Sequence, residues 1–218
     1  MQEEVNYTPG IIGVLKDCRW RFVLIWFFYN LLVFYATRPL TRNRAHVNME
    51  TALDRAIPFQ TPWILIYIVV AFFSWYTGYV LLAGEKKETV IYFFGAEYIA
   101  KSICLIFFLA MPTTMNRPEV TGHSIFDWMT RQIFSADTPD NLFPSIHCLE
   151  SWLLARSASS IKRLGKWYAP TMYVVAIVVF LSTLFVKQHV AWDVLGGVLA
   201  AEIGLLVMKV IRKNKEHA

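Results

Sequence analysis

The sequence predicts an all-α integral membrane protein, a six-transmembrane-helix bundle with a short interfacial helix between helices 1 and 2. Of its 218 residues, 56% are hydrophobic and 17% are charged, whereas soluble domains contain about a quarter charged residues. The apolar residues also form long runs separated by short polar segments, which is typical of transmembrane helices. The length predicts a single membrane domain over residues 1–218, with no large soluble appendage.

Six segments have the character of membrane-embedded helices. Five of them are long apolar runs, at residues 22–37, 63–83, 89–111, 167–186 and 190–211. The fourth in chain order, residues 145–157, is short and weakly apolar, so we expect the other helices to bury it. The first run has no small-x-small cleavage site, so we expect it to remain as a helix.

The connections between the runs predict two further helices. Apolar residues recur at roughly helical spacing over residues 45–57, which predicts the interfacial helix. On that helix we expect His46 and Asp54 to lie on a solvated face and not in a site. The longest polar stretch, residues 112–144, contains an amphipathic helical segment at residues 125–134.

Charge and cysteine usage exclude two other classes of protein. The net charge is +5, but the basic residues lie between apolar runs, where membrane topology explains them. We therefore exclude nucleic acid as a partner. Cys18, Cys104 and Cys148 are odd in number and lack a paired spacing. We expect them to be small core residues and not a disulfide framework or a metal site.

The basic residues also predict an orientation in the membrane. With six spans, both termini and the turns at residues 84–88 and 156–166 lie on one side. That side carries more flanking Lys and Arg than the other side, although the loops of the other side are much longer. The positive-inside rule places both termini in the cytoplasm, in what we expect to be the cell (plasma) membrane.

One ion pair is expected within the membrane. Glu97 and Lys101 interrupt the third span four residues apart, so they share a helix face and can offset each other's burial. We interpret them as an internal ion pair that faces the bundle. A proton or substrate relay is the alternative.

Three polar motifs fall on the same predicted face, opposite the termini. Arg117 follows the third span, Pro144-Ser-Ile-His147 opens the fourth helix, and a third motif ends at Asp193, between the last two spans. In the third motif His189 and Asp193 are four residues apart and share a helix face. The carboxylate can fix the imidazole tautomer, which leaves the other nitrogen free as a base or a nucleophile.

These residues have the chemistry of a phosphate site. Pro144 just ahead of a helix leaves the first N–H groups of that helix pointing outward, where they can bind an anion. Arg117 offers a planar fork for phosphate oxygens, and Lys187 adds a point charge. Two histidines with such donors suit phosphoryl transfer, in which positioning and charge stabilisation dominate.

Each of these residues also has a simpler interpretation. Arg117 and Lys187 can meet lipid headgroups, Ser145 can act only as a helix cap, and His147 can be a satisfied interfacial histidine. A metal site made from the two histidines and the aspartate lacks a fourth ligand with suitable spacing, and the nearby cations would repel the ion. The convergence of three segments on one face favours chemistry.

In this order the three motifs resemble the type 2 phosphatidic acid phosphatase superfamily of membrane lipid phosphatases. The pattern of that family is K-x6-R-P, then P-S-G-H, then S-R-x5-H-x3-D, on a six-helix bundle. The resemblance covers about residues 60–211. Three positions depart from the pattern: Ala110 replaces the lysine, Ile146 the glycine and Thr183 the second arginine. Such variants are similar to the inositol phosphorylceramide synthase-like phosphotransferase branch.

The resemblance implies a role for each matching residue. His189 attacks phosphorus, Asp193 orients it, and His147 protonates the leaving group and then activates water. The phosphate-binding residues are then Arg117, Ser145, Ile146, Ser182 and Thr183, with Lys187 as the candidate replacement for a missing cation. The resemblance implies neither a metal nor another cofactor. Glu150, one turn after His147, could tune that histidine or have a structural partner in the bundle.

The expected function is that of a lipid phosphate or diphosphate phosphatase, acting through a phosphohistidine intermediate at the outer membrane face. Its partners are then the lipid phosphate substrate and the surrounding membrane lipids. Two alternatives stay open. A lipid phosphotransferase would pass a phosphoryl or head group to an alcohol acceptor with the same nucleophile and acid. A lipid transporter or binding protein on the same bundle would use the polar cluster only to hold a head group.

Overall fold

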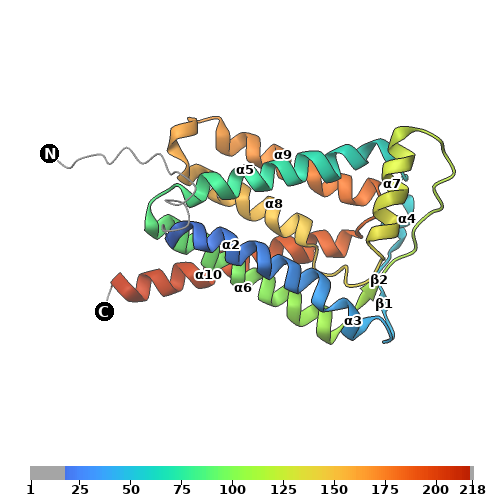
Figure 1. The fold of residues 1–218 in the computed structure, drawn as a ribbon, viewed down its shortest axis with the longest axis horizontal. Helices are drawn as coiled ribbons and strands as arrows, with labels where there is room; N and C mark the ends of the chain where they lie inside the picture. Colours follow the sequence, from blue (N-terminus) through green and yellow to red (C-terminus); the bar gives the residue numbers. More distant parts are fainter. Residues whose placement is uncertain (1–17, 217–218) are drawn as a thin grey trace.

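The computed structural model describes residues 18–216, with side chains from Arg21 onward (Figure 1). The helices are α2 (Cys18–Leu31), α3 (Arg38–Thr41), α4 (Ala52–Ala56), α5 (Ala71–Ala83), α6 (Lys87–Ala110), α7 (Ile125–Ala136), α8 (Ile146–Ser157), α9 (Tyr168–Phe185) and α10 (Ala191–Glu216). Wider π-helical turns are Leu32–Ala36 and Ile66–Val70, and 3-10 turns are Thr61–Trp63, Ala158–Ser160 and Lys162–Leu164. Two short strands, β1 (Val47–Asn48) and β2 (Thr113–Thr114), pair in parallel. Cys104 and Cys148 are buried free thiols, as expected, and the side chain of Cys18 lies outside the described part.

Five helical segments within residues 18–216 are long and apolar enough to span a membrane. They are Arg21–Thr41, Thr61–Ala83, Lys87–Ala110, Tyr168–Phe185 and Ala191–Glu216. The five long spans expected from the sequence are therefore present. The count of six spans is not confirmed, because α8 has 12 residues. At 1.5 Å per residue this is about 18 Å of helix, against a hydrocarbon core of about 30 Å.

α8 lies in the middle of the bundle, in contact with α5, α6, α9 and α10 (Figure 1). Eight of its 12 residues are buried, as expected for this short and weakly apolar segment. Its contact with α10 depends on a glycine, since a Cβ at Gly197 would lie 2.4 Å from the carbonyl oxygen of Ser145. Small residues let membrane helices approach each other closely. The start of α8 is thereby held against the first turns of α10.

A buried ion cluster joins α6 to α8 inside the bundle. The Nζ of Lys101 lies 2.7 Å from Oε1 of Glu97 and 2.5 Å from Oε1 of Glu150, and all three side chains are buried. Lys101 also donates to the side-chain oxygen of Asn30 on α2. The predicted internal ion pair of Glu97 and Lys101 is confirmed. Of the two roles considered for Glu150, the structure shows the structural partner.

The polar connections gather at the end of the bundle opposite the C-terminal end of α10 (Figure 1). The predicted interfacial helix over residues 45–57 is wrong in its first half, because β1 pairs with β2 there and only α4 is helical. That helix begins at Ala52 because a capping box of Thr51 and Asp54 satisfies its first amides. His46 is partly exposed, but Asp54 is only 3% exposed. The solvated face expected for Asp54 was therefore wrong.

The amphipathic segment predicted in the long polar stretch is confirmed as α7. A capping box of Ser124 and Asp127 starts this helix, and the hydroxyl of Thr61 donates to Oδ1 of Asp127 at 2.7 Å. Its apolar face packs on residues near the ends of two spans: Ile64, Tyr67 and Val186. α7 therefore covers the same end of the bundle at which the motif residues lie (Figure 1).

Candidate active site

The turn between α9 and α10 carries the first candidate residues. The amide of His189 donates to the carbonyl of Thr183 at 3.2 Å, so the chain leaves α9 in a tight turn. Within this turn Lys187 has a φ of 56°, a left-handed conformation that is uncommon for a residue with a side chain. Such strain persists only where surrounding contacts hold it, and it clusters at functional sites.

His189 and Asp193 form a buried pair at the start of α10. The Nδ1 of His189 lies 3.2 Å from Oδ2 of Asp193, and the amide of Val190 donates to the same oxygen at 2.9 Å. Nδ1 therefore faces a carboxylate oxygen, and Nε2 is the ring nitrogen that Asp193 does not engage. The contact expected across one helix face is present. Within residues 18–216, no group of three or more His, Cys, Asp or Glu side chains is arranged to hold a metal ion.

α8 brings a second histidine to the same place. The amide of Ser145 donates to the carbonyl of Asp193 at 3.0 Å, which fastens the start of α8 to α10. Two residues later the ring of His147 stacks on Tyr67 at 4.3 Å, and its centroid lies 5.0 Å from that of Trp75. The Nε2 of His147 is buried and has no hydrogen-bond partner among the described residues. Aromatic contacts, and not a hydrogen bond of Nε2, orient this ring.

The two histidine rings border one narrow cavity. Their centroids are 5.9 Å apart and their planes are inclined by 55°. Both line a cavity of about 20 Å³, which also includes Tyr67, Asp137 and Asp140 in its wall. This volume holds about one water molecule, so a phosphoryl group requires a wider opening. The arrangement lets one imidazole nitrogen bond to a reacting atom while the other imidazole moves a proton.

Arg117 approaches this cavity through Gln188, the neighbour of the candidate nucleophile. Its Nη2 donates to Oε1 of Gln188 at 2.7 Å, and its Nη1 donates to the carbonyl of Asp137. Its guanidinium carbon lies 4.8 Å from the ring centre of Phe134. Burial lowers the pKa of Arg117 and Asp137 opposes this, so the group stays charged. The buried Nε has no hydrogen-bond partner among the described residues.

Lys187 directs its ammonium group to α4. Its Nζ donates to the carbonyls of Asp54 and Ile57, each at 2.6 Å. The Oδ1 of Asp54 accepts from the amide of Ala191, the first residue of α10, at 2.7 Å. Burial raises the pKa of Asp54, but hydrogen bonds from Thr51 and Ala191 lower it by more, so the carboxylate is ionised. α4 therefore holds the turn on both sides of the candidate nucleophile.

The hydroxyl groups predicted to bind phosphate are hydrogen-bonded to backbone atoms of the helices. Ser182 and Thr183 each donate to a carbonyl three residues earlier, at 2.6 and 2.7 Å. The hydroxyl of Ser145 accepts from the amide of Cys148 at 3.3 Å and caps α8. None of the three lines the narrow cavity, whereas Ile146 does. The structure thus unites the two histidines, the aspartate and Ile146. Phosphate binding by the hydroxyl groups and the two cations stays a prediction.

Residues 90–216, more than half of the chain, match the PAP2 superfamily. The chain belongs to the PAP2 superfamily. The resemblance predicted from the three motifs is thereby confirmed. Members of this family are generally metal-independent phosphatases or phosphotransferases that act on phosphate esters. No curated protein and no solved structure matches the chain.

The PAP2 match begins at α6, yet earlier residues help to build the site. Tyr67 packs on the α8 histidine, Asp54 holds the turn before α10, and Arg38 pairs with Asp140 in the cavity wall. Sequence reasoning did not assign these residues to a site. A usable signal existed only for Arg38, because it and Arg42 are four apart at the polar end of the first span.

Proposed function

We propose that this PAP2 superfamily member is a membrane phosphatase that hydrolyses lipid phosphates or diphosphates through a phosphohistidine at His189. One observation carries the proposal. His189, held by Asp193, shares a narrow cavity with His147, and the two ring centroids are 5.9 Å apart. A nucleophile oriented by a carboxylate and a second imidazole with an unpartnered Nε2 are the two groups that displacement at phosphorus needs.

The reaction has two displacements. In the first, Nε2 of His189 bonds to phosphorus, the bond from phosphorus to the leaving oxygen breaks, and His147 gives that oxygen a proton. Asp193 stabilises the positive charge on the phosphorylated imidazole. In the second, His147 removes a proton from water, the water oxygen bonds to phosphorus and the N–P bond breaks. His189 is then neutral again, and inorganic phosphate leaves.

Positive charge for the phosphoryl oxygens comes from two sources in this proposal. Arg117 supplies the charge of its guanidinium, whose bonds to Asp137 and Gln188 leave further N–H groups for the phosphoryl oxygens. The first amides of α8, including that of Ile146, add the positive end of a helix dipole. We assign Lys187 to positioning, because its ammonium group is held by two α4 carbonyls. The hydroxyl groups of Ser145, Ser182 and Thr183 fix the ends of α8 and α9.

A lipid substrate suits the place of the cavity in the bundle. The spans present apolar side chains outward, as in Phe72, Phe73 and Tyr76, which are 55%, 69% and 69% exposed. A lipid phosphate can keep its chains beside these residues while its phosphate reaches the cavity. The candidate substrates are phosphatidic acid, phosphatidylglycerol phosphate and polyprenyl diphosphate. From the flanking basic residues we further propose cytoplasmic termini and a site at the outer leaflet of the cell membrane.

A phosphotransferase is the second candidate function. Its first displacement is the same, and an alcohol takes the place of water in the second. A second cavity, whose wall includes Arg42, Thr138 and Asp140, lies next to the histidine cavity and favours this candidate, since it offers room for an acceptor. A transporter that only holds a head group would not depend on a nucleophilic histidine, so loss of function in His189→Ala separates it from both enzymes.

The test is a panel of lipid phosphates given to the purified protein in EDTA, with and without alcohol acceptors. Inorganic phosphate and transferred product are both measured. We expect metal-free turnover by the wild type and a loss on the order of 10⁴-fold or more in His189→Ala. The matched control is His123→Ala, an exposed histidine in the loop before α7, which keeps full activity. Turnover by His189→Ala would refute the nucleophile assignment, and inhibition of the wild type by EDTA would refute the metal-free mechanism.

A further inference from the structure

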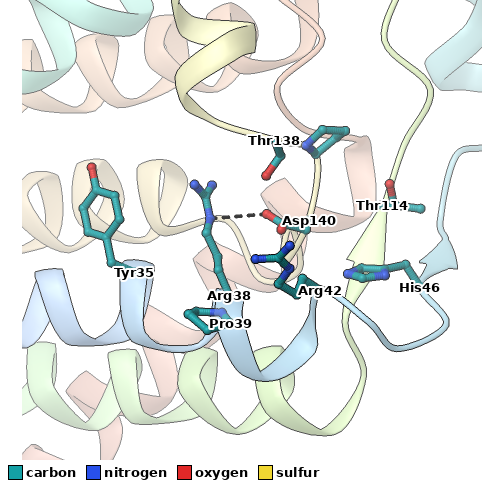
Figure 2. Close-up of a pocket in the computed structure, with 9 residues that line it drawn as sticks. Tyr35, Arg38, Pro39, Arg42, His46, Thr114, Thr138 and Asp140 are labelled. Carbon is teal, nitrogen blue, oxygen red and sulfur yellow. Dashed lines mark ion pairs between the residues drawn. The ribbon is translucent and has the colours of Figure 1, made fainter.

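A second and larger cavity lies beside the histidine cavity. It has a volume of about 740 Å³ and is bounded by α3, the loop after α3, β2 and residues 138–140. Figure 2 shows Arg38 and Arg42 next to Asp140. The ring of His46 lies beyond Arg42, on the side away from Arg38. The volume is within the usual range of about 300–1,000 Å³ for sites that bind small molecules. Of the residues spanned by the three PAP2 motifs, Thr114 lines this cavity, at a variable position of the first motif.

The two cavities share a wall. Asp140 lines both of them, and its Oδ1 pairs with Nε of Arg38 at 3.3 Å. Arg38 also pairs with Asp137, which lines the histidine cavity and whose carbonyl accepts from Arg117. A short segment, residues 137–140, therefore separates the larger cavity from the place of phosphoryl transfer. A group bonded to phosphorus, or about to attack it, could extend into the larger cavity.

Unsatisfied polar atoms indicate the class of ligand. The Nδ1 of His46 lies 2.9 Å from the carbonyl of Arg44, and a carbonyl only accepts. Nδ1 therefore carries a proton, which it donates to this carbonyl. The Nε2 of His46 is buried and has no hydrogen-bond partner among the described residues. Oδ1 of Asp140 also lacks a hydrogen bond among these residues, although it forms an ion pair. Buried polar atoms in proteins are normally satisfied, so both atoms are places where a group of a ligand can bond.

The cavity also offers donors. The guanidinium of Arg42 is exposed, and the hydroxyl groups of Thr114 and Thr138 belong to the lining. A phosphate dianion or a carboxylate brings only acceptors, so it would leave Oδ1 of Asp140 without a donor. A group with several hydroxyls can bond to His46, donate to Asp140 and accept from the arginine and the threonines.

We propose that this larger cavity binds a polyhydroxylated group of one of the reactants, while phosphoryl transfer takes place in the histidine cavity. The group is either the polyol head group of the lipid or a free polyol that accepts the phosphoryl group. In both cases the cavity recognises a group with several hydroxyls. That the polyol takes part in phosphoryl transfer rests on the proposed function, whereas its binding does not, because binding requires no turnover.

Binding is tested first, by saturation-transfer NMR on the purified protein with glycerol as the probe. We expect a glycerol signal in the wild type and in His123→Ala, and a signal at least about fivefold weaker in His46→Ala and Thr138→Val. The compound 1-propanol, which has the same carbon chain and one hydroxyl, gives no signal. The inference is overturned if glycerol gives no signal with the wild type, or if neither variant weakens it. This arm decides the inference even if phosphate release is never observed.

Turnover then identifies the source of the polyol. If glycerol is an acceptor, phosphatidic acid yields phosphorylated glycerol, and His46→Ala lowers the ratio of transferred to hydrolysed product about tenfold. If the polyol is a head group, no transfer occurs. His46→Ala then lowers kcat/KM about tenfold more for phosphatidylglycerol phosphate than for phosphatidic acid. Equal losses in every reaction would assign His46 to the fold alone and overturn the inference.

Discussion

Two buried polar clusters lie one turn apart on α8, and they are built differently. Glu150 belongs to the cluster in the middle of the bundle, where Lys101 lies between two carboxylates at 2.5 and 2.7 Å. His147 belongs to the cluster at the end of the bundle, where its Nε2 is buried without a partner and faces a cavity. The first cluster contains its own counter-charges and lines neither cavity. Both clusters contain buried atoms without a hydrogen-bond partner among the described residues, but only the second lies beside a cavity.

A charge inside a membrane protein persists where an opposite charge pairs with it, which accounts for Lys101 between Glu97 and Glu150. We therefore interpret the first cluster as structural. Under the proposed function, the cluster of His147, His189 and Asp193 is the reactive one. Substitutions in the first cluster should therefore change stability, and substitutions in the second should change chemistry.

The largest effect is expected from His147→Gln, which removes the proposed acid and base. We expect kcat for a lipid phosphate to fall about 10²–10⁴-fold, while the thermal unfolding midpoint in the same detergent changes little. A nitrophenyl phosphate ester sharpens this test, because its leaving group needs no proton. The first displacement of that substrate should suffer much less. Equal losses for both substrates would show that His147 does not protonate the leaving group.

The next effect is on stability and comes from Glu150→Ala. This variant removes one of the two carboxylates that hold Lys101 and leaves its pair with Glu97, so we expect a loss of about 1.5–3 kcal/mol in unfolding free energy for one charged hydrogen bond. The kcat of the folded fraction should stay unchanged. The matched control is the triple variant Glu97→Gln, Lys101→Met and Glu150→Gln, which removes the charges together and should regain most of the stability. A loss of kcat at unchanged stability would instead mean that Glu150 tunes His147.

The smallest effect is expected from Lys187→Met, which keeps the length of the side chain but loses both bonds to α4. As a positioning residue Lys187 should affect kcat, with a loss of roughly five- to tenfold for one or two hydrogen bonds, and should leave KM unchanged. The control is Arg55→Met, an exposed residue of α4. A higher KM at unchanged kcat would mean that Lys187 contacts the substrate phosphate, as the sequence alone predicted.

Patterns in the sequence predicted the helices and the contacts between residues that are close in the chain. Hydropathy identified the five long spans. A spacing of four residues identified two contacts. Helix geometry brings Glu97 and Lys101 together within α6, whereas His189 precedes α10 and meets Asp193 in the turn at its start. The three motifs also converge at one end of the bundle, since the order of the helices places their ends there.

Contacts between distant segments could not be predicted in this way. Asp54 caps α10 across 137 positions of the chain, and nothing in its own neighbourhood indicates this partner. A two-residue strand such as β1 has no periodicity, and it forms only because β2 lies next to it. Tyr67 looks like any aromatic residue of an apolar span until α8 places His147 against it. The cavity beside the active site depends on such contacts.

Isolation of the covalent intermediate tests whether His189 is the nucleophile. The purified protein is mixed with a nitrophenyl phosphate ester, denatured in alkali, in which an N–P bond survives, and mapped by mass spectrometry. We predict phosphate on His189 in the wild type, more of it in His147→Gln because water is no longer activated, and none in His189→Ala. Phosphate on another residue, or turnover without any phosphate on His189, would contradict the account.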